Sequence, residues 1–411
     1  MAAVTIDDSM NKKQTIIPRP QYLSQLMDFK DMDVIKVVTG IRRCGKSTLL
    51  RLFAEHLKEH GITDDQIISV NFESDEFEDM TDRKELYRYV KDRIYRNGRT
   101  YIFLDEIQAV EGFEKTVDSF MADFDADIYL TGSNSKMLSS DLSTLLSGRC
   151  VEIRMYPLSF KEYMSVRPGE HPEDRFYDYI RYGGFPLIAD EKGERTISTY
   201  LDGLYNTIVL KDVIRRNSIK DPALIEKLIR LVFSSVGSLV SPLSIANTIG
   251  GGKVSNETID SYLDMLCNAH IISKAVRYDI KGKEYLKTLN KYYVTDMGLR
   301  NNLMNYRQVE PTRALENIIY FELLRRGYKV DVGKVGDTEV DFVARDGNGT
   351  KYYQVAWTVN DRPETAVREY RAFDAIRDHY EKTLITMDRD PFNPSGGVKK
   401  INAIDFLLDG A

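Results

Sequence analysis

Cysteine and histidine are scarce in this chain of 411 residues, which contains three cysteines and five histidines. Cys44, Cys150 and Cys267 lie far apart in the sequence and show no metal-ligand spacing. This usage excludes a disulfide framework and is typical of a reducing compartment. His56 and His60 are four residues apart, but the glutamate that follows the first histidine in zinc enzymes is missing, so we expect no zinc site.

Long apolar runs are also missing. Met1–Lys13 contains two aspartates and no apolar core, so we expect no signal peptide. Leu231–Gly250 is the strongest candidate for a membrane span, but its five serines and Pro242 make it too polar to cross a bilayer. We therefore expect a cytoplasmic protein that does not contact a membrane.

The sequence has no excess of basic charge, since 57 Lys and Arg residues stand against 63 Asp and Glu, a net charge of −6. This balance excludes a protein that is coated with basic charge, but it does not exclude a local basic patch. Hydrophobic residues make up 42% and charged residues 29%, as is usual for globular proteins. At about 150 residues per domain, the length predicts two or three domains.

Residues 1–157 alternate short apolar runs with longer amphipathic stretches. Such alternation of strand and helix predicts an α/β domain with a parallel sheet and helices on both faces. The expected strands are Val34–Thr39, Ile67–Phe72, Tyr101–Leu104, Ile128–Leu130 and the more polar, edge-like Val151–Met155, and the expected helices include Ser47–Glu59 and Arg83–Tyr95.

The pattern changes after residue 157. Residues 158–303 are mainly helical and are interrupted by Gly183–Pro186, a helix breaker. They contain three helices and then a hairpin, the order of a winged helix-turn-helix, and residues 304–411 form a third, α/β unit. The helices are expected at Leu224–Phe233, Leu243–Thr248 and Asn256–Ala269, the hairpin strands at Ile271–Tyr278 and Leu289–Val294, and the last unit at Leu315–Arg326, Lys329–Val332, Glu339–Ala344 and Lys351–Val355.

A P-loop pattern of Gly, four residues, Gly, Lys and Ser or Thr follows the first expected strand and opens an amphipathic helix. In such a loop, backbone N–H groups and the helix N-terminus bind phosphate. Lys46 would reach the β- and γ-phosphates, and Ser47 would ligate Mg²⁺. We therefore expect ATP and Mg²⁺ as cofactors. The predicted phosphate-binding residues are Gly40, Ile41, Arg42, Arg43, Cys44, Gly45, Lys46, Ser47 and Thr48.

An acidic pair follows the apolar strand at Tyr101–Leu104. Asp105, at the end of that strand, could hold Mg²⁺ directly or through water. Glu106 is then placed to polarise a water molecule that attacks the γ-phosphate. The pair indicates an ATPase that hydrolyses its nucleotide.

Three further groups of residues are candidates for the site. Ser133 and Asn134 follow the strand Ile128–Leu130, at a position from which either could orient the attacking water. Arg149 is a candidate arginine finger that acts either on its own site or on the site of a neighbouring subunit. Arg42 and Arg43 are unusual inside a P-loop, and the sequence leaves open whether they contact phosphate, acidic residues or a partner subunit.

The chain resembles a prokaryotic ATPase family of the AAA superfamily in its GIRRCGKST loop, FLDEIQ strand end, LTGSN strand tip, SGR…YPLSFKEY segment and GGFP turn. That family pairs the ATPase core with a C-terminal domain of unknown function. The likeness covers nearly the whole chain. It implies a five-stranded AAA-type core that binds and hydrolyses ATP, and it implies no biological role.

Residues 304–411 resemble the restriction-endonuclease-like fold in Glu316 and Asp341 and in the strand that ends near Val355. In active members of that fold, acidic residues gather Mg²⁺, and the last strand carries a glutamate and a lysine that activates water. This chain has Gln354 and Ala356 at those positions. We therefore expect a scaffold that binds nucleic acid or protein and does not cut nucleic acid.

Two other lysines come into question as replacements for the missing one. Lys351 lies on the same strand as Ala356 but five residues away, so its side chain should point to the other side of the sheet. Lys334 could act from across the hairpin, and this alternative stays open.

The expected winged helix allows two roles. Its third helix could enter a DNA major groove, but it carries Glu257, Asp260 and Asp264, which phosphates would repel. DNA contact and a role as a lid or protein-interaction surface both stay open. The expected wing is basic and could contact a DNA backbone through Lys281, Lys283, Lys287 and Lys291.

The sequence as a whole predicts an Mg²⁺-dependent ATP hydrolase whose nucleotide state moves the winged-helix and C-terminal parts. One alternative is a switch that binds ATP and turns it over slowly. A metal-dependent nuclease is a further alternative, which Gln354 and Ala356 disfavour. A protein partner is expected but is not identified by the sequence, which leaves open whether the chain forms a homo-oligomer.

Overall fold

A computed structural model describes residues 4–5, 15–77, 79–134, 148–251, 254–286, 289–306, 310–361, 363–389 and 397–409. The chain divides into two compact units. Unit 1 contains residues 1–157 and 268–270, and unit 2 contains the rest. In the described part of the chain, every helix is too short or too polar to cross a membrane.

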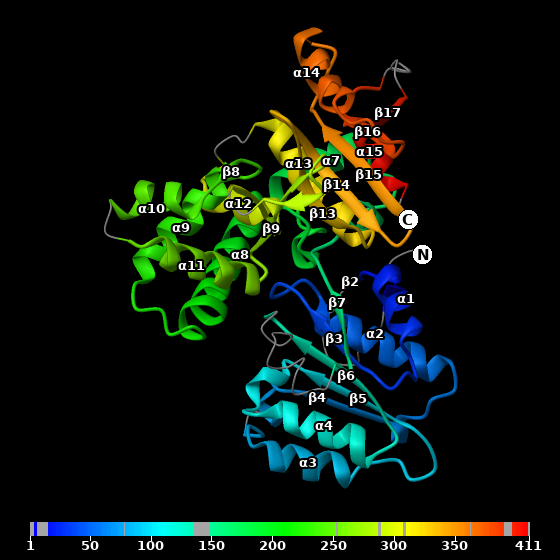
Figure 1. The fold of residues 1–411 in the computed structure, drawn as a ribbon. Helices are drawn as coiled ribbons and strands as arrows, with labels where there is room; N and C mark the ends of the chain where they lie inside the picture. The colour runs from blue at the N-terminus through cyan, green and yellow to red at the C-terminus, as the bar shows by residue number, and fades with distance from the viewer. Residues whose placement is uncertain are drawn as a thin grey trace. The chain divides into compact units, whose positions relative to one another are not determined.

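Unit 1 is built on a parallel sheet of five strands in the order β4-β5-β6-β3-β7 (Figure 1). The α/β fold class and the five-stranded core are therefore confirmed, with β7 at the edge as predicted. The strands are β3 (Ile35–Thr39), β4 (Ile67–Asn71), β5 (Thr100–Asp105), β6 (Ala126–Gly132) and β7 (Cys150–Arg154), the helices are α1 (Pro20–Asp28), α2 (Lys46–Glu59), α3 (Arg83–Lys91) and α4 (Phe113–Asp123), and β1 (Val4–Thr5) pairs with β2 (Thr15–Ile16).

Alternating side chains divide the strands of this sheet between two apolar layers. Ile102 and Leu104 of β5 belong to a core cluster with residues of α3 and α4. Phe103, between them, points to the opposite face, where its ring lies 4.9 Å from Tyr129 and 6.3 Å from Phe53 of α2. Figure 1 shows α2 on one face of the sheet and α3 and α4 on the other.

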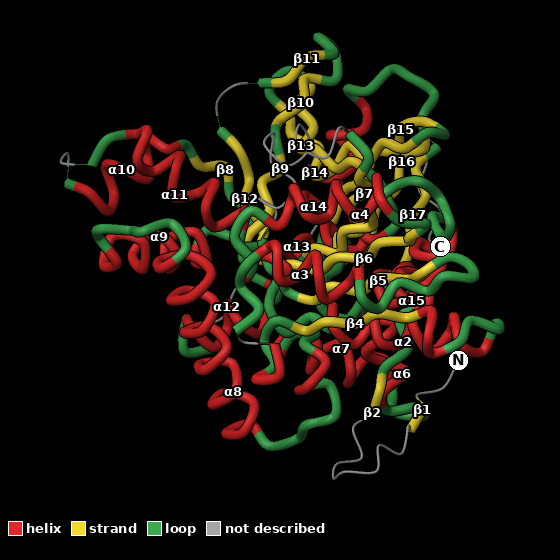
Figure 2. The backbone as a smooth tube through the Cα atoms, turned by 90° about the horizontal axis from the view of Figure 1, so that it is seen from below, coloured by secondary structure: helices red, strands yellow, loops and turns green. Residues whose placement is uncertain are grey.

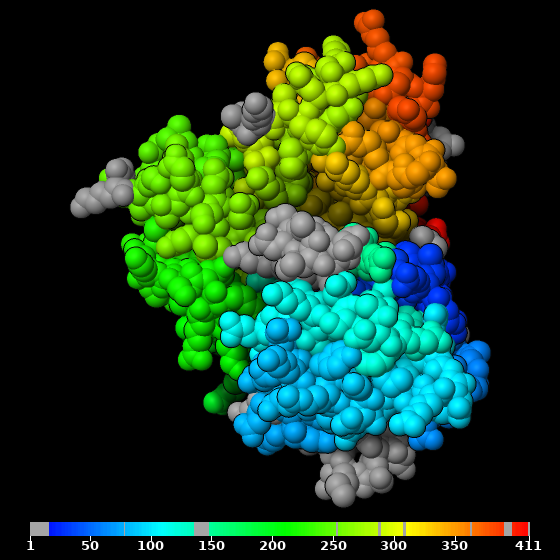
Figure 3. All heavy atoms as spheres, turned by 60° about the horizontal axis from the view of Figure 1, so that its bottom comes forward, coloured from blue at the N-terminus to red at the C-terminus, as the bar shows by residue number. Residues whose placement is uncertain are grey.

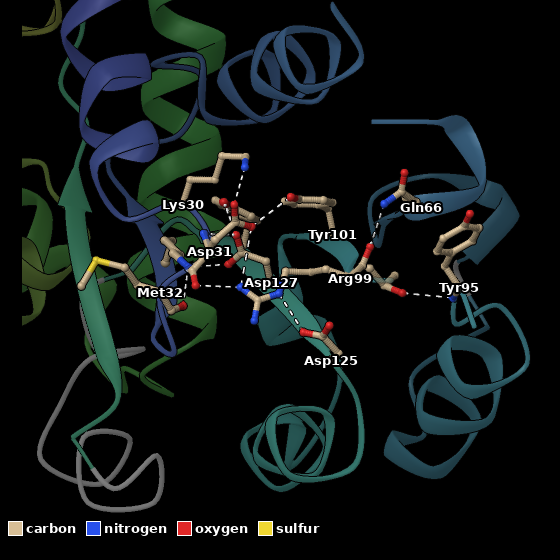
Figure 4. Close-up of polar contacts among 12 residues, drawn as sticks. Lys30, Asp31, Met32, Gln66, Tyr95, Arg99, Tyr101, Asp125 and Asp127 are labelled. Carbon is tan, nitrogen blue, oxygen red and sulfur yellow. Dashed lines mark hydrogen bonds and ion pairs between the residues drawn. The ribbon is translucent and has the colours of Figure 1, made fainter. Parts of the chain in front are cut away.

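A polar network holds the amino-terminal end of these strands (Figure 4). Asp127 of β6 pairs with the buried ammonium of Lys36 in β3 and accepts hydrogen bonds from Tyr129 and from the backbone N–H of Asp31. Asp31 in turn accepts a hydrogen bond of 2.9 Å from the Tyr101 hydroxyl. Because Lys36 and Asp127 are fully buried, each charge depends on the other for compensation.

Unit 2 begins with helices and a small antiparallel sheet in the order β8-β12-β9. The helices at Leu224–Phe233, Leu243–Thr248 and Asn256–Ala269 occur close to where the sequence predicts them. The elements are α6 (Phe160–Val166), α7 (Pro172–Tyr182), α8 (Glu194–Thr207), a π-helix at Ile208–Arg215, α9 (Pro222–Ser234), β8 (Leu239–Val240), α10 (Pro242–Gly250), α11 (Asn256–Asn268), β9 (Ile272–Ala275), β12 (Asn290–Val294) and α12 (Met297–Leu303).

The rest of unit 2 is a mixed sheet of seven strands in the order β11-β10-β13-β14-β15-β16-β17. Helix α13 lies against this sheet, and its Tyr320 stacks on Tyr293 of β12 with ring centroids 4.1 Å apart. The elements are β10 (Arg277–Asp279), β11 (Glu284–Tyr285), α13 (Pro311–Arg325), β13 (Lys329–Val335), β14 (Thr338–Asp346), β15 (Gly349–Val355), α14 (Pro363–Asp374), β16 (Glu381–Thr386), β17 (Val398–Asn402) and α15 (Ala403–Leu408).

The predicted hairpin is divided between the two sheets of unit 2. Its base, β9 and β12, pairs as expected, but its tip forms β10 and β11, and β10 pairs in parallel with β13. Figures 2 and 3 show this tip beside β13 and its neighbours. Strand pairing therefore crosses the predicted boundary between residues 303 and 304, and that boundary stays a prediction.

The helix breaker after α7 packs against the start of α12. Gly183 has a φ of 83°, and a Cβ atom on it would lie 2.0 Å from the Asp296 carboxylate. Asp296 is buried, accepts a hydrogen bond of 2.7 Å from the backbone N–H of Gly184, and caps α12 by accepting another from Leu299. Burial raises the pKa of Asp296 to about 6, although these backbone hydrogen bonds favour the charged form.

Candidate functional site

The P-loop leaves β3 and curls over the first turn of α2. Gly40 and Gly45 have φ values of 150° and 106°, and Arg43 is also left-handed, with a φ of 67°. A Cβ atom on Gly40 would lie 2.2 Å from the carbonyl oxygen of Met155, so only glycine fits there. Successive N–H groups in such a curl form a binding site for anions. The loop thus has the backbone conformation that its sequence predicts.

The loop is supported from outside the P-loop pattern by Arg19. This buried guanidinium donates hydrogen bonds to the carbonyl oxygens of Cys44, at 3.0 Å, and Tyr156, at 2.8 Å. The Cys44 side chain is fully buried, and its Sγ lies 3.7 Å from the carbonyl oxygen of Met155. Burial raises the pKa of the Cys44 thiol. Cys44 therefore packs inside the loop and supports its conformation. Arg19 could not be predicted from the sequence motif, because it lies far from the motif in the chain.

Lys46 lies between the loop and the acidic pair. Its Nζ donates a hydrogen bond of 3.0 Å to the carbonyl oxygen of Gly40 and lies 3.5 Å from Oε1 of Glu106. The side chain is buried, with 4% of it exposed. A buried ammonium in this position can neutralise phosphate charge in a medium where that charge is poorly screened.

Asp105 ends β5 beside the start of α2. Its carboxylate accepts hydrogen bonds from the hydroxyls of Ser47 and Thr131, the latter on the neighbouring strand β6. Burial raises the pKa of Asp105, and these two hydrogen bonds partly oppose that effect. A hydroxyl and a carboxylate are oxygen ligands of the kind that Mg²⁺ prefers, so Ser47 and Asp105 fit the predicted metal site.

Glu106 is held in a strained backbone conformation. Its φ is 56°, an uncommon value for a residue other than glycine, and its side chain is buried. The carboxylate pairs with Lys46 and accepts a hydrogen bond from Gln108. Such strain persists where surrounding contacts enforce it and is concentrated at functional sites.

Thr131 is a site residue that the sequence analysis did not single out. Its hydroxyl donates to Asp105 and accepts a hydrogen bond of 2.8 Å from the backbone N–H of Glu106. One hydroxyl thus orients both members of the acidic pair. Ser133 and Asn134, the residues that were predicted here, are buried directly beyond the end of β6. Because β6 lies between β5 and β3, they share the edge of the sheet that carries the P-loop.

The two loop arginines have different surroundings. Arg42 forms an ion pair with Glu73, which follows β4. The sequence left open whether this side chain contacts phosphate, an acidic residue or a partner subunit, and in the structure it contacts an acidic residue. Arg43 is exposed. Thr48 lies in the first turn of α2, beside the loop.

Arg149 cannot act as an arginine finger on its own site. It directly precedes β7, and its carbonyl oxygen accepts a hydrogen bond from Ile35 at the start of β3. The P-loop begins after Thr39, at the other end of β3, and five residues of strand span about 16 Å. An arginine side chain does not bridge that distance. The exposed Arg149 is left with the second predicted role, contact with a neighbouring subunit, which stays a prediction.

A second cluster of charged side chains lies in unit 2. Glu316 of α13 and Asp341 of β14, the two acidic residues predicted to lie together, converge on the ammonium of Lys291. Lys351 lies elsewhere, over the Tyr328 ring and 3.9 Å from Glu381, as its side-chain parity predicts. Gln354 donates a hydrogen bond of 2.7 Å to Glu369.

The predicted basic wing is wrong at Lys291, which is buried. The sequence placed it among lysines that could contact a DNA backbone, but its side chain is 4% exposed and paired with carboxylates. Lys281 and Lys283 are exposed at the tip, and Lys287 lies outside the described residues. The burial of Lys291 could not be predicted locally, because its carboxylate partners belong to α13 and β14, later in the chain.

Residues 33–164 match the model of an AAA domain, and residues 173–310 match the model of a domain of unknown function. An uncharacterized protein of Haemophilus influenzae is 41% identical over 404 residues, which cover 96% of this chain and 99% of that protein. The uncharacterized protein MJ1544 of Methanocaldococcus jannaschii is 31% identical over 367 residues, which cover 84% of this chain and 79% of that protein.

A solved structure, the Walker-type ATPase paby2304 of Pyrococcus abyssi, shares the fold with a TM-score of 0.50 at 16% identity, over 71% of this chain and 97% of that one. The matches to the AAA domain and to the second domain cover the motifs that carry the predicted likeness, from the GIRRCGKST loop to the GGFP turn. The chain therefore belongs to a prokaryotic family of the AAA superfamily, in which a P-loop ATPase domain is followed by a domain of unknown function.

Proposed function

We propose that this protein is an Mg²⁺-dependent ATP hydrolase that couples its nucleotide state to unit 2. The observation that supports this most directly is the convergence of Lys46, Ser47, Asp105 and Glu106 at one edge of the parallel sheet. Ser47 and Asp105 would hold Mg²⁺, which neutralises charge on the β- and γ-phosphates. Lys46 binds the phosphates from the other side, and Glu106 polarises the attacking water.

The acidic pair gives the decisive experiment. Glu106→Gln should keep ATP affinity but lower the steady-state rate of hydrolysis by about 10²- to 10⁴-fold, because an amide does not accept a proton from water. Lys46→Ala should instead weaken ATP binding by about tenfold or more. Asp118→Asn, an exposed carboxylate on α4, serves as the control. Normal hydrolysis by both Glu106→Gln and Asp105→Asn would remove the basis of the proposal.

A slow switch is the second candidate, and the contacts of Glu106 favour it. The carboxylate is engaged by Lys46 and Gln108, so it must leave these partners before it can polarise water. Single-turnover and steady-state rates separate the two candidates. A switch limited by the contacts of Glu106 converts its bound ATP slowly even in a single turnover, and a switch limited by product release shows one fast turnover followed by a slow steady state. A fast ATPase shows fast and similar rates in both measurements.

We further propose that the site works between copies of the chain, with Arg149 of one subunit at the nucleotide of the next. The support is its exposed position at the end of β7 that lies away from its own P-loop. Mixing Arg149→Ala with Lys46→Ala protein tests this, since each lacks a different half of a shared site. Activity that appears only in the mixture supports the proposal, and an inactive mixture contradicts it.

For unit 2, we propose a binding role without nucleic-acid cleavage. The order α9, β8, α10, α11, β9 and β12 is that of a winged helix, and α13 with β13, β14 and β15 supports a restriction-endonuclease-like scaffold. Glu257, Asp260 and Asp264 are exposed on α11, whose apolar side is buried, so a protein partner fits this face better than DNA. Unchanged ATPase rates in the presence of DNA, and no gel shift, are the expected results.

A further inference from the structure

Three carboxylates from two elements surround one ammonium inside unit 2. Nζ of Lys291 lies 2.8 Å from Oε1 of Glu316, 2.7 Å from Oε1 of Glu339 and 3.7 Å from Oδ1 of Asp341. Lys291, Glu316 and Asp341 are at most 11% exposed, and Glu339 is 33% exposed. The lysine comes from β12, in the small sheet, whereas its partners belong to α13 and β14.

The carboxylates are also fixed by groups around them. Glu316 accepts a hydrogen bond of 2.6 Å from the Tyr293 hydroxyl, and Asp341 accepts one of 2.9 Å from the backbone N–H of Val355. Gln354 accepts a hydrogen bond from the backbone N–H of Asp341 through Oε1 and donates to Glu369 through Nε2. Tyr293 and Lys291 thus share one oxygen of Glu316, whereas Val355 holds the oxygen of Asp341 that is not paired with Lys291.

This arrangement resembles a cation-binding site in which the ammonium group of Lys291 takes the place of a bound cation. Several buried carboxylates repel one another and need positive charge close by. Oxygen ligands of this kind would also suit a divalent ion. The ammonium lies where their oxygen atoms converge, so a metal ion and Lys291 cannot occupy the cluster together.

We propose that Lys291 is an internal counter-ion that occupies this carboxylate cluster, keeps divalent cations out of it and ties the small sheet to the large one. Replacing the ammonium with a small neutral side chain opens the cluster to a divalent cation. The inference does not depend on the proposed ATP hydrolysis, because all of its groups lie in unit 2.

The test is calorimetric titration of Mn²⁺ into the nucleotide-free protein. Lys291→Ala should bind Mn²⁺ at least about tenfold more tightly than the original chain, because three carboxylates lose their cation. Adding Glu316→Gln and Asp341→Asn to Lys291→Ala should abolish the gain. Lys291→Arg keeps the charge and should behave like the original chain. Lys382→Ala is the matched control, since Lys382 is a half-buried lysine of the seven-stranded sheet whose ammonium donates to the backbone carbonyls of Phe373 and Ile376.

Two results would overturn the proposal. One is a folded Lys291→Ala variant that gains no affinity for Mn²⁺. The other is an original chain that already binds Mn²⁺ and loses this binding on Glu316→Gln. The second measurement needs no substitution at Lys291, so it decides the matter even where that substitution impairs folding.

Discussion

At the scale of single residues, the hydroxyl of Thr131 links the two acidic side chains of the ATPase site. It donates to Asp105 and accepts from the backbone N–H of Glu106. Thr131→Val keeps the shape but removes the hydroxyl, so we expect a loss of about 1–3 kcal/mol in the free energy of unfolding together with slower hydrolysis. Urea unfolding and steady-state ATPase rates measure the two effects.

A buried threonine away from the site provides the control. Thr116 donates a hydrogen bond of 3.0 Å to the carbonyl oxygen of Arg83, in the same unit. Thr116→Val should lower stability and leave hydrolysis unchanged. If Thr131→Val affects the ATPase rate no more than Thr116→Val does, the orienting role of Thr131 is wrong.

Asp296 makes stability depend on pH in a definite direction. Burial raises its pKa in the folded protein to about 6, above its usual 3.8. Between these values the folded chain holds a proton that the unfolded chain has lost, so stability falls as the pH rises through about 6. Compared with Asp296→Asn, the protein should lose about 3 kcal/mol of unfolding free energy between pH 3.5 and pH 7. Equal pH profiles for the two proteins would contradict this.

The residues that the sequence identified correctly are those whose role depends on their neighbours in the chain. Lys46 and Ser47 follow a strand and open a helix, and this local order determines their position. Thr131, Arg19 and Lys291 could not be identified in this way, because their partners lie 25 or more residues away in sequence. Lys291 shows the limit most clearly, since a lysine beside a basic tip looks exposed until α13 and β14 supply its carboxylates.

At the scale of elements, the turn after α7 depends on glycine for a steric reason. Gly183→Ala would place a Cβ atom against the Asp296 carboxylate and would force a left-handed backbone on alanine. We expect a loss of about 2 kcal/mol or more in unfolding free energy. Gly203→Ala is the matched control, because Gly203 is an exposed helical residue with open space around it and should gain up to about 1 kcal/mol. Thermal unfolding of both variants checks the contrast, and equal midpoints would contradict it.

The strands of unit 1 could be predicted because apolar runs and intervening helices recur in sequence order. The tip of the hairpin in unit 2 could not. Its local pattern is that of an ordinary turn between two strands, whereas its pairing is decided by β13, whose sequence lies about 50 residues later. Non-local pairing of this kind leaves no trace in the periodicity of either segment.

At the scale of the whole molecule, the strand pairing predicts where the chain can be divided. Residues 158–411 expressed alone should give a cooperative unfolding transition, because they keep both sheets of unit 2 intact. Residues 304–411 should not, since they lack β10 and the ammonium of Lys291, which leaves buried carboxylates uncompensated. Circular dichroism during heating compares the two fragments. A cooperative transition in residues 304–411 would show that this segment is an independent domain.

The buried thiol of the P-loop gives the intact protein a chemical reporter of its own. Cys44 is inaccessible and its raised pKa keeps it protonated, whereas Cys150 and Cys267 are partly exposed. Burial raises the pKa of Cys150 as well, so exposure decides the order, and alkylating reagents should modify the two partly exposed cysteines first. Modification of Cys44 then requires the loop to detach from Met155 and Arg19. The rate of Cys44 modification, measured by mass spectrometry with and without nucleotide, would report how often the phosphate-binding loop opens.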